Sequence, residues 1–394
     1  MPKRLKQNNI ESLRIDYCDS LLFIARNTLP SSLKSLSIWG CKKLQHLEGI
    51  NSTPLEYLSI SDCESLMCLS SRALLPKTLK SLCIYRCRNL TTLLSTRWCV
   101  HESLEILCIY DCPKLKSLEE AFNNSPRLQA VQLVGLQNLE SNRLFGLQNL
   151  TGLEYLTLHD SWDFSIGEEV EISKRLIRWG LHNLTSLKHL QIKGFEDPEL
   201  ILSEDQQMPI SLESLKISNF APFRSISDLG TLTSLTDLII EDSPNLKSIP
   251  DLGSLVSLKS FRIESCLKIK SISDLESHTS IEEFIIGSCP NLKSIACLGC
   301  LTSLQTLKIW DCPNLESIAC LGSLTSLQTL TIWYSLKLKS LPSLPPSLLE
   351  LNIVECPLLK KQWRRGKGKY CSKIAHIPKV EIDSNLIFNS KEEN

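Results

Sequence analysis

One short pattern of apolar and polar positions recurs along the whole chain. It reads apolar-x-x-apolar-x-apolar, often followed by x-x-Cys, as in LKSLSIWGC from residue 33 and LQTLKIWDC from residue 304. Apolar residues two positions apart lie on the same side of a strand, so each copy predicts a short strand with one buried side. The copies begin at residues 10, 33, 55, 79, 104, 128, 153, 187, 212, 235, 258, 281, 304, 327 and 348.

The spacing of these copies decides the expected fold. Most copies are 21 to 25 residues apart and one spacing is 34, which matches the leucine-rich-repeat pattern L-x-x-L-x-L-x-x-N/C. One copy cannot bury its leucines alone, so neighbouring copies must stack. We therefore expect an α/β solenoid of about 15 repeats, with one long parallel sheet on the concave face. The convex side should consist mostly of loops and short helical pieces.

The chain length of 394 residues alone would suggest two or three domains, but the repeats predict a single solenoid. We expect a polar lead over 1–9, the solenoid over 10–359 with an irregular middle at 128–234, and a basic tail over 360–394. In the tail, Ile377, Val380 and Ile382 predict a last strand that covers the final repeat. A charged insertion at 161–180 and an acidic stretch at 195–207 are either binding loops or tolerated surface loops.

The repeat pattern also explains many of the 17 cysteines. A buried thiol is a small hydrophobic group with a weak hydrogen-bond donor, which suits the point where the chain leaves each strand. The one C-x-x-C pair, Cys297 and Cys300, has no second pair and no nearby histidine, so we expect no metal. Nine cysteines occupy the repeat's Cys position: Cys18, Cys41, Cys63, Cys87, Cys112, Cys266, Cys289, Cys312 and Cys356.

The composition and the missing motifs argue against several classes of function. Lys+Arg and Asp+Glu are both 43, and this zero balance argues against nucleic-acid binding. The sequence contains no phosphate-binding loop, H-E-x-x-H or G-x-S-x-G motif, so we expect neither an enzyme nor a cofactor. It has no apolar run long enough for a membrane span and no signal peptide, so we expect a cytoplasmic protein that can also be nuclear.

The outward positions of the predicted strands carry large aromatic side chains with charged residues beside them. Trp310 and Trp333 occupy the same position in adjacent copies, so we expect their rings to stack, and Tyr85 and Tyr110 likewise. Exposed Trp and Tyr clusters are typical of protein-binding hot spots, although cross-strand pairs can also serve the sheet alone. The candidate partner-binding residues are Trp39, Tyr85, Tyr110, Arg262, Lys308, Trp310, Trp333 and Tyr334.

Two segments give the chain a family resemblance. The repeat LQTLKIWDCPNLESI at 304–318 and the ending CPLLKKQWRRGKGKYCSKIAHIPKVEID at 356–383 resemble plant intracellular nucleotide-binding leucine-rich-repeat disease resistance proteins of the coiled-coil class. The resemblance implies that the chain senses a pathogen effector or a guarded host protein. It also implies an autoinhibitory contact with the nucleotide-binding domain of the same receptor.

That family's coiled-coil and nucleotide-binding domains are missing from the sequence. We therefore expect a fragment, a truncated paralogue or a gene product begun at an internal Met. The main alternative is a leucine-rich substrate adaptor of a ubiquitin ligase, of the F-box type, which also uses Cys at this position. A secreted repeat receptor is a weaker alternative, because the cysteine count is odd.

Overall fold

The structure is a computed structural model in which the strands follow the predicted repeats. It divides into two compact units, one built mainly from 1–194 and the other mainly from 210–394. The structure describes residues 9–24, 28–48, 50–70, 75–94, 100–136, 146–159, 180–194, 208–218, 229, 232–248, 252, 255–272, 275, 280–296, 298–365, 374–383 and 385–389.

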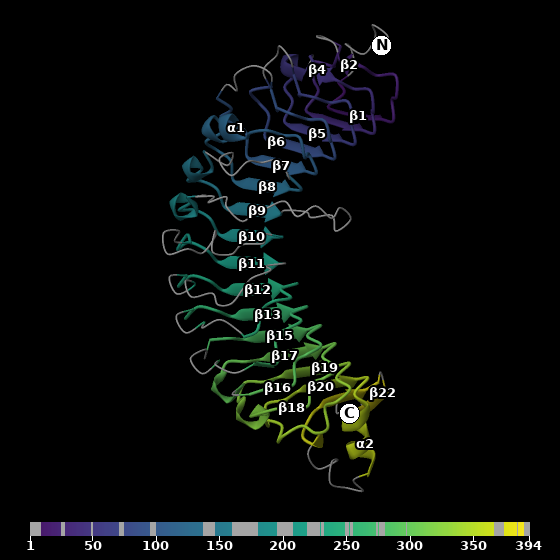
Figure 1. The fold of residues 1–394 in the computed structure, drawn as a ribbon, viewed down its shortest axis with the longest axis vertical. Helices are drawn as coiled ribbons and strands as arrows, with labels where there is room; N and C mark the ends of the chain where they lie inside the picture. Colours follow the sequence, from purple (N-terminus) through teal and green to yellow (C-terminus); the bar gives the residue numbers. More distant parts are fainter. Residues whose placement is uncertain are drawn as a thin grey trace. The chain divides into compact units, whose positions relative to one another are not determined.

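The first unit is a stack of rungs that each contribute one five-residue strand to a parallel sheet (Figure 1). Equivalent residues pair across rungs, as Leu36 does with Leu58. The strands follow one another in sequence order: β1 (Ser12–Asp16), β3 (Ser35–Trp39), β5 (Tyr57–Ser61), β6 (Ser81–Tyr85), β7 (Ile106–Tyr110), β8 (Ala130–Val134), β9 (Tyr155–His159) and β10 (His189–Lys193).

The second unit repeats this arrangement and ends differently. After β20 (Glu350–Val354), the strand β21 (Lys379–Ile382) adds in parallel, and β22 (Asn385–Asn389) pairs with β21 in the antiparallel sense. The chain between β20 and β21 includes the helix α2 (Pro357–Arg365). The parallel strands are β11 (Ser214–Ser218), β12 (Asp237–Glu241), β13 (Ser260–Glu264), β15 (Glu283–Gly287), β17 (Thr306–Trp310), β19 (Thr329–Trp333) and β20 (Glu350–Val354).

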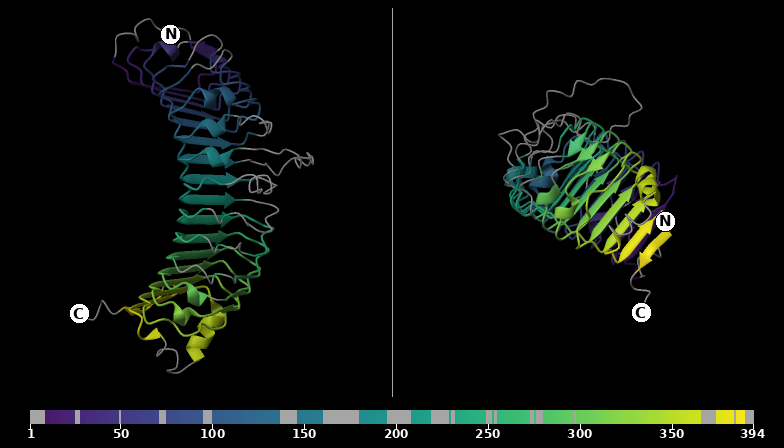
Figure 2. Two further views of the ribbon diagram at one scale, coloured as in Figure 1. Left: turned by 90° about the vertical axis from the view of Figure 1, so that its left-hand side faces the viewer. Right: turned by 90° about the horizontal axis from the view of Figure 1, so that it is seen from below.

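Before α2, the described parts of the return segments contain short elements, which lie apart from the rows of long strands (Figure 2). This agrees with the predicted loops and short helical pieces. The two-residue strands are β2 (Phe23–Ile24), β4 (His46–Leu47), β14 (Ser271–Ile272), β16 (Ser294–Ile295) and β18 (Ser317–Ile318). The helical turns are η2 (Ile50–Ser52), α1 (Glu119–Asn123), η3 (Leu147–Asn149), η4 (Leu181–Asn183), η7 (Leu298–Cys300) and η8 (Leu321–Ser323).

The predicted alternation is confirmed in both units. Leu36 and Ile38 of β3 are each 1% exposed, and Leu330 and Ile332 of β19 are fully buried. Each side chain of this size contributes about 1.5–3 kcal/mol when it is removed from water. The first, third and fifth residues of each strand lie on the other side of the sheet, which we call the open face.

A left-handed turn follows each five-residue strand whose next residue the structure describes. The residue after the strand has a positive φ, for example 55° at Asp62 and 51° at Asp311. Its backbone N–H donates to the last carbonyl of the following strand, as Asp62 does to Tyr85 at 2.9 Å. The turn therefore adds a hydrogen bond between rungs beyond the strand itself.

The repeat cysteines follow directly after this turn. Cys63 Sγ donates to the Ser61 carbonyl at 3.5 Å, and the same contact recurs at Cys87 and Cys312. Eight of the nine are buried, as predicted, but Cys18 is exposed. Cys18 belongs to the first described rung, and no described strand lies on its other side, so the prediction of burial was wrong there.

Several predicted features fall wholly or largely outside the described residues. These are the polar lead at 1–9, the charged insertion at 161–180, the acidic stretch at 195–207 and residues 366–373 of the basic tail predicted over 360–394. Within the described part of the chain, no helix is both long and apolar enough to cross a membrane.

Candidate functional site

A pair of tyrosines forms the best-defined feature of the open face of the first unit. Tyr85 ends β6 and Tyr110 ends β7, and the strand register places them side by side. Their rings stack with centroids 5.0 Å apart and planes 25° apart, as predicted. The Tyr110 hydroxyl donates to Gln132 Oε1 on β8. Burial raises the pKa of both phenols, so both stay protonated at neutral pH.

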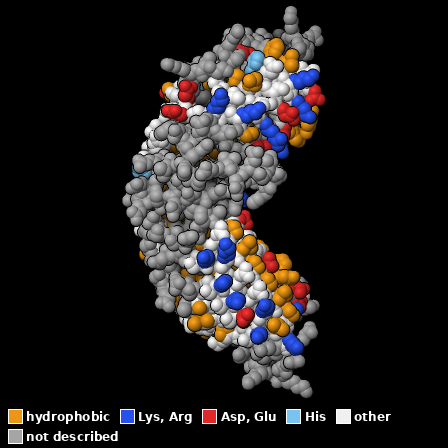
Figure 3. Space-filling model, in the orientation of Figure 1, with side chains coloured by type: hydrophobic (Ala, Val, Ile, Leu, Met, Phe, Trp, Pro, Cys, Tyr) orange, Lys and Arg blue, Asp and Glu red, His pale blue; other side chains and the backbone are white. Residues whose placement is uncertain are grey.

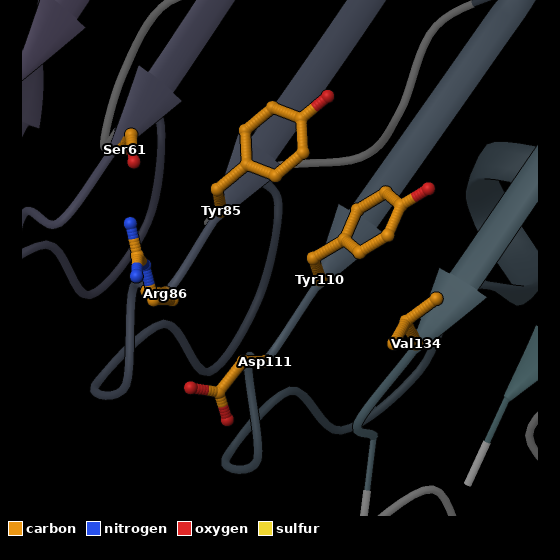
Figure 4. A pocket seen from close by; sticks show the side chains of 6 residues that line it. All are labelled: Ser61, Tyr85, Arg86, Tyr110, Asp111 and Val134. Atoms are coloured by element: carbon orange, nitrogen blue, oxygen red, sulfur yellow. The ribbon is translucent and has the colours of Figure 1, made fainter. Parts of the chain in front are cut away.

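These rings line a hollow of about 320 Å³ at the ends of four adjacent strands (Figure 4). Val134, at the end of β8, adds an apolar side chain to the lining of the hollow. Arg86 and Asp111, in the turns that follow β6 and β7, add charged side chains. A partly buried aromatic surface with a charged rim is the composition found in protein-binding patches. The complete lining is Ser61, Tyr85, Arg86, Tyr110, Asp111 and Val134.

The charged residues beside the hollow form exposed ion pairs. Arg86 Nε lies 3.0 Å from Asp62 Oδ1, and Arg88 Nε lies 3.6 Å from Asp111 Oδ2. The arginine side chains of these pairs are 58% and 70% exposed. Exposed pairs of this kind contribute only about 0–1 kcal/mol to stability. Their charges therefore remain available to a partner at little cost to the fold.

Trp39, at the end of β3, is held in one orientation by polar contacts. Its Nε1 donates to Asp62 Oδ2 at 2.8 Å, and the Arg14 guanidinium lies 5.6 Å from the ring centroid. Burial acts to raise the pKa of Asp62, but hydrogen bonds from Ser61, Trp39 and Arg86 and the charge of Arg86 lower it below its usual range. The indole therefore binds a carboxylate that is ionised at neutral pH.

A neighbouring tyrosine was missed in the sequence. Tyr17 is 61% exposed, and its ring centroid lies 5.0 Å from that of Trp39. It sits in the turn after β1 rather than on the strand, with a φ of 52°. The predicted residue Tyr334 takes the same turn position after its strand, so the sequence did hold a signal for Tyr17.

The two tryptophans of the second unit are arranged differently from the prediction. They do pair in register, at the ends of β17 and β19. The Trp310 ring, however, lies over Gly287 at the end of β15, where any side chain would overlap it. The structure records no ring contact between the two described tryptophans, so the predicted stack was wrong. Because Gly287 has no side chain, the Trp310 ring can lie against the end of β15. Trp333 remains 53% exposed.

The other predicted residues of this unit lie on the open face or in the turn after a strand. Tyr334 follows β19 in the turn, with a φ of 55°, and is 43% exposed. Lys308 Nζ lies 3.0 Å from Glu283 Oε1, and Arg262 lies 3.5 Å from Glu264. Figure 3 shows hydrophobic side chains gathered at the side of this unit where β15, β17 and β19 end.

A further aromatic pair on the open face was missed in the sequence. Tyr155 of β9 stacks on His189 of β10, with centroids 4.5 Å apart and planes 9° apart. Both occupy the first position of their strands and are paired in register. Each lies two residues after the start of its copy, at 153 and 187, so the alignment of the copies held this signal, but the aromatic candidates were drawn only from the ends of the predicted strands.

No family model matches the sequence, and no curated protein matches it. Solved structures do resemble it. The Toll chain of the Drosophila Toll–Spätzle complex has 13% identity and a TM-score of 0.51, over 96% of this chain and 51% of that chain. The fold is a leucine-rich-repeat solenoid. This chain thus spans about half the length of the Toll chain, and at this identity the likeness shows the fold alone.

Two further structures are similar over most of their length, with lower TM-scores. An internalin from Listeria monocytogenes has 20% identity and a TM-score of 0.39, over 79% of this chain and 86% of that one. A leucine-rich-repeat protein from Leptospira interrogans has 16% identity and a TM-score of 0.34, over 87% and 90%. Scores this low carry no argument about function.

Proposed function

We propose that this chain is the protein-recognition module of a plant immune receptor of the coiled-coil nucleotide-binding class. Its partner is a pathogen effector, a guarded host protein or the nucleotide-binding domain of the same receptor. The repeat at 304–318 and the ending at 356–383 support the family assignment through their resemblance to such receptors. The open faces of the strands in both units are the proposed contact surfaces.

One observation carries the proposal most directly. Tyr85 and Tyr110 form a stacked, half-buried pair beside a hollow with a charged rim. Tyrosine offers a large contact area at low entropic cost, and it is enriched among residues that dominate binding energy. Trp333, with 53% of its surface exposed, offers a similar anchor in the second unit. The leucine and isoleucine side chains fill the core without these rings. Packing of the core therefore does not explain why the rings lie on the outside.

The experiment compares variants in the full-length receptor that carries this chain. Changing Tyr85 and Tyr110 together to alanine, or changing Trp333 to alanine, should abolish the effector-triggered response. Loss of one hot-spot residue costs about 2 kcal/mol or more, which is roughly a 30-fold loss of affinity.

The matched controls are exposed apolar residues on the return segments. Met67 and Val256 are 58% and 68% exposed and lie outside the strands. Met67→Ala and Val256→Ala should keep the response, and all variants should show the far-ultraviolet circular dichroism of the unaltered protein. An unchanged response in the tyrosine and tryptophan variants would overturn the proposal.

A further inference from the structure

Two strands of the first unit carry a second cysteine in addition to the one in the repeat's Cys position. Cys83 lies at the middle of β6 and Cys108 at the middle of β7, and the strand register pairs them directly. Both occupy the third strand position, so their side chains lie on the open face, outside the leucine core. Cys87 and Cys112 of the same two rungs are fully buried instead. These two rungs therefore hold one thiol pair inside and one outside.

The backbone spacing suits a bond between the outer thiols. Paired residues on neighbouring strands lie about 4.8 Å apart, within the Cα separation that disulfides span. The two residues face each other in the strand register, and both thiols are free in this structure. Each also has a polar neighbour: Ser81 Oγ lies 3.7 Å from Cys83 Sγ, and Cys108 Sγ donates to Gln132 Oε1 at 3.6 Å.

The two sulfur atoms differ in access and in charge. Cys83 is half-buried, and its neighbour across the sheet on β5 is the small Ser59, whereas Cys108 is 6% exposed and lies beside Gln132. Hydrogen bonding from Cys108 lowers the pKa of Cys83 against the effect of burial, with smaller contributions from Ser81 and Tyr85. The same contact and burial raise the pKa of Cys108. A thiolate is the reactive form of cysteine, so Cys83 is the nucleophile of the pair.

We propose that Cys83 and Cys108 are an oxidation site for a hydroperoxide, with Cys83 as the attacking thiol and Cys108 as the resolving thiol. This inference does not rest on the proposed function. The Cys83 thiolate attacks one oxygen of the hydroperoxide, the O–O bond breaks, and water or an alcohol leaves after taking a proton. Cys83 becomes a sulfenic acid.

The second step closes the bond between the strands. Cys108 Sγ attacks Cys83 Sγ, the S–O bond breaks, and water leaves with the thiol proton of Cys108. The two thiols lose two electrons in total, and the hydroperoxide gains them. The product links β6 to β7 two residues before Tyr85 and Tyr110, on the same face of the sheet.

The test treats the reduced full chain with hydrogen peroxide and follows each thiol by peptide mass mapping. Cys320 is the reference for exposure, because it is exposed and Cys83 is only half-buried. We expect the Cys83–Cys108 disulfide to form at least tenfold faster than Cys320 is oxidised. Cys320 reacting first, or Cys83 and Cys108 remaining unlinked while it reacts, would overturn the proposal.

Three variants separate the roles of the thiols. Cys108→Ser should leave Cys83 as a sulfenic acid that dimedone traps, and Cys83→Ser should leave Cys108 reduced. The matched control changes the inner pair of the same rungs, Cys87→Ala with Cys112→Ala, and should still form the outer disulfide. Dimedone labelling at Cys108 rather than Cys83 would show that the assigned order is wrong.

Discussion

A single substitution tests why cysteine follows the turn in this solenoid. Ser335 stands in the repeat's Cys position and is fully buried, and its Oγ has no hydrogen-bond partner among the described residues. The neighbouring rungs carry Cys312 and Cys356 there, and their Sγ atoms donate to the strand-end carbonyls at 3.5 and 3.3 Å. Ser335→Cys should therefore restore a contact that the adjacent rungs already make.

The size of the effect follows from the buried hydroxyl. A buried hydroxyl without a partner costs about 1–3 kcal/mol, and a buried thiol behaves as a small hydrophobic group. We expect Ser335→Cys to raise the free energy of unfolding by about 1–2 kcal/mol. Ser243 is the matched control, because its Oγ already donates to the Glu241 carbonyl at 3.1 Å. Ser243→Cys should change stability by less than about 0.5 kcal/mol.

Guanidinium unfolding under reducing conditions, followed by circular dichroism, measures both variants. The midpoint of Ser335→Cys should rise with an unchanged slope, since the surface exposed on unfolding is the same. Equal midpoints for the two variants, or a lower midpoint for Ser335→Cys, would refute this explanation of the cysteine position.

Three further predictions test the packing around the site. Gly287→Ala should push the Trp310 ring off the sheet, because the new methyl group would overlap the indole, and tryptophan fluorescence should shift to longer wavelength. The indole N–H resonance of Trp39 should hold its position down to about pH 4 and move at lower pH. The ionised form of Asp62 stabilises the folded protein at pH values above the pKa that Asp62 has in the unfolded chain. This stabilisation is lost as the pH falls through the lowered pKa of Asp62 in the folded protein. Phe284→Ala should destabilise the second unit by about 3–5 kcal/mol in urea unfolding, because the ring is fully buried.

Each of these three predictions has a control variant or a result that would contradict it. Gly152→Ala meets no atom within 4 Å of the new methyl group and should leave the fluorescence unchanged. Asp62→Asn should remove the acid response of Trp39, and its persistence would assign the response to another group. A loss below about 1 kcal/mol for the phenylalanine variant would mean that the Phe261–Phe284 stack, with centroids 5.3 Å apart, contributes little to the core.

The strands could be predicted from sequence because burial fixes their register. In β3, shifting the pairing by one residue would expose Leu36 and Ile38 and bury Ser37, so only one register is stable. The same logic placed a strand in each of the fifteen copies. Domain boundaries along the chain, by contrast, stay a prediction.

The arrangement of the side chains on the open face depends on neighbours that the repeat does not specify. Trp310 lies over the end of β15 because that strand ends in Gly287 instead of a larger residue. Tyr155 meets His189 across the one irregular spacing of the array. The rule of equal positions in adjacent copies correctly predicted the stacking of Tyr85 on Tyr110, where the flanking strands end in Ser61 and Val134 and not in glycine.

The central claim is that the open face contacts a protein, and site-specific photocrosslinking tests it most directly. A photoreactive amino acid is placed at Tyr110 or Trp333, and at Met67 or Val256 as controls, in the full-length protein expressed in plant tissue. The account predicts light-dependent adducts from the open-face positions only, with peptides from a pathogen effector, a guarded host protein or the receptor's own nucleotide-binding domain. The same adducts from the control positions, or none from the open face, would contradict it.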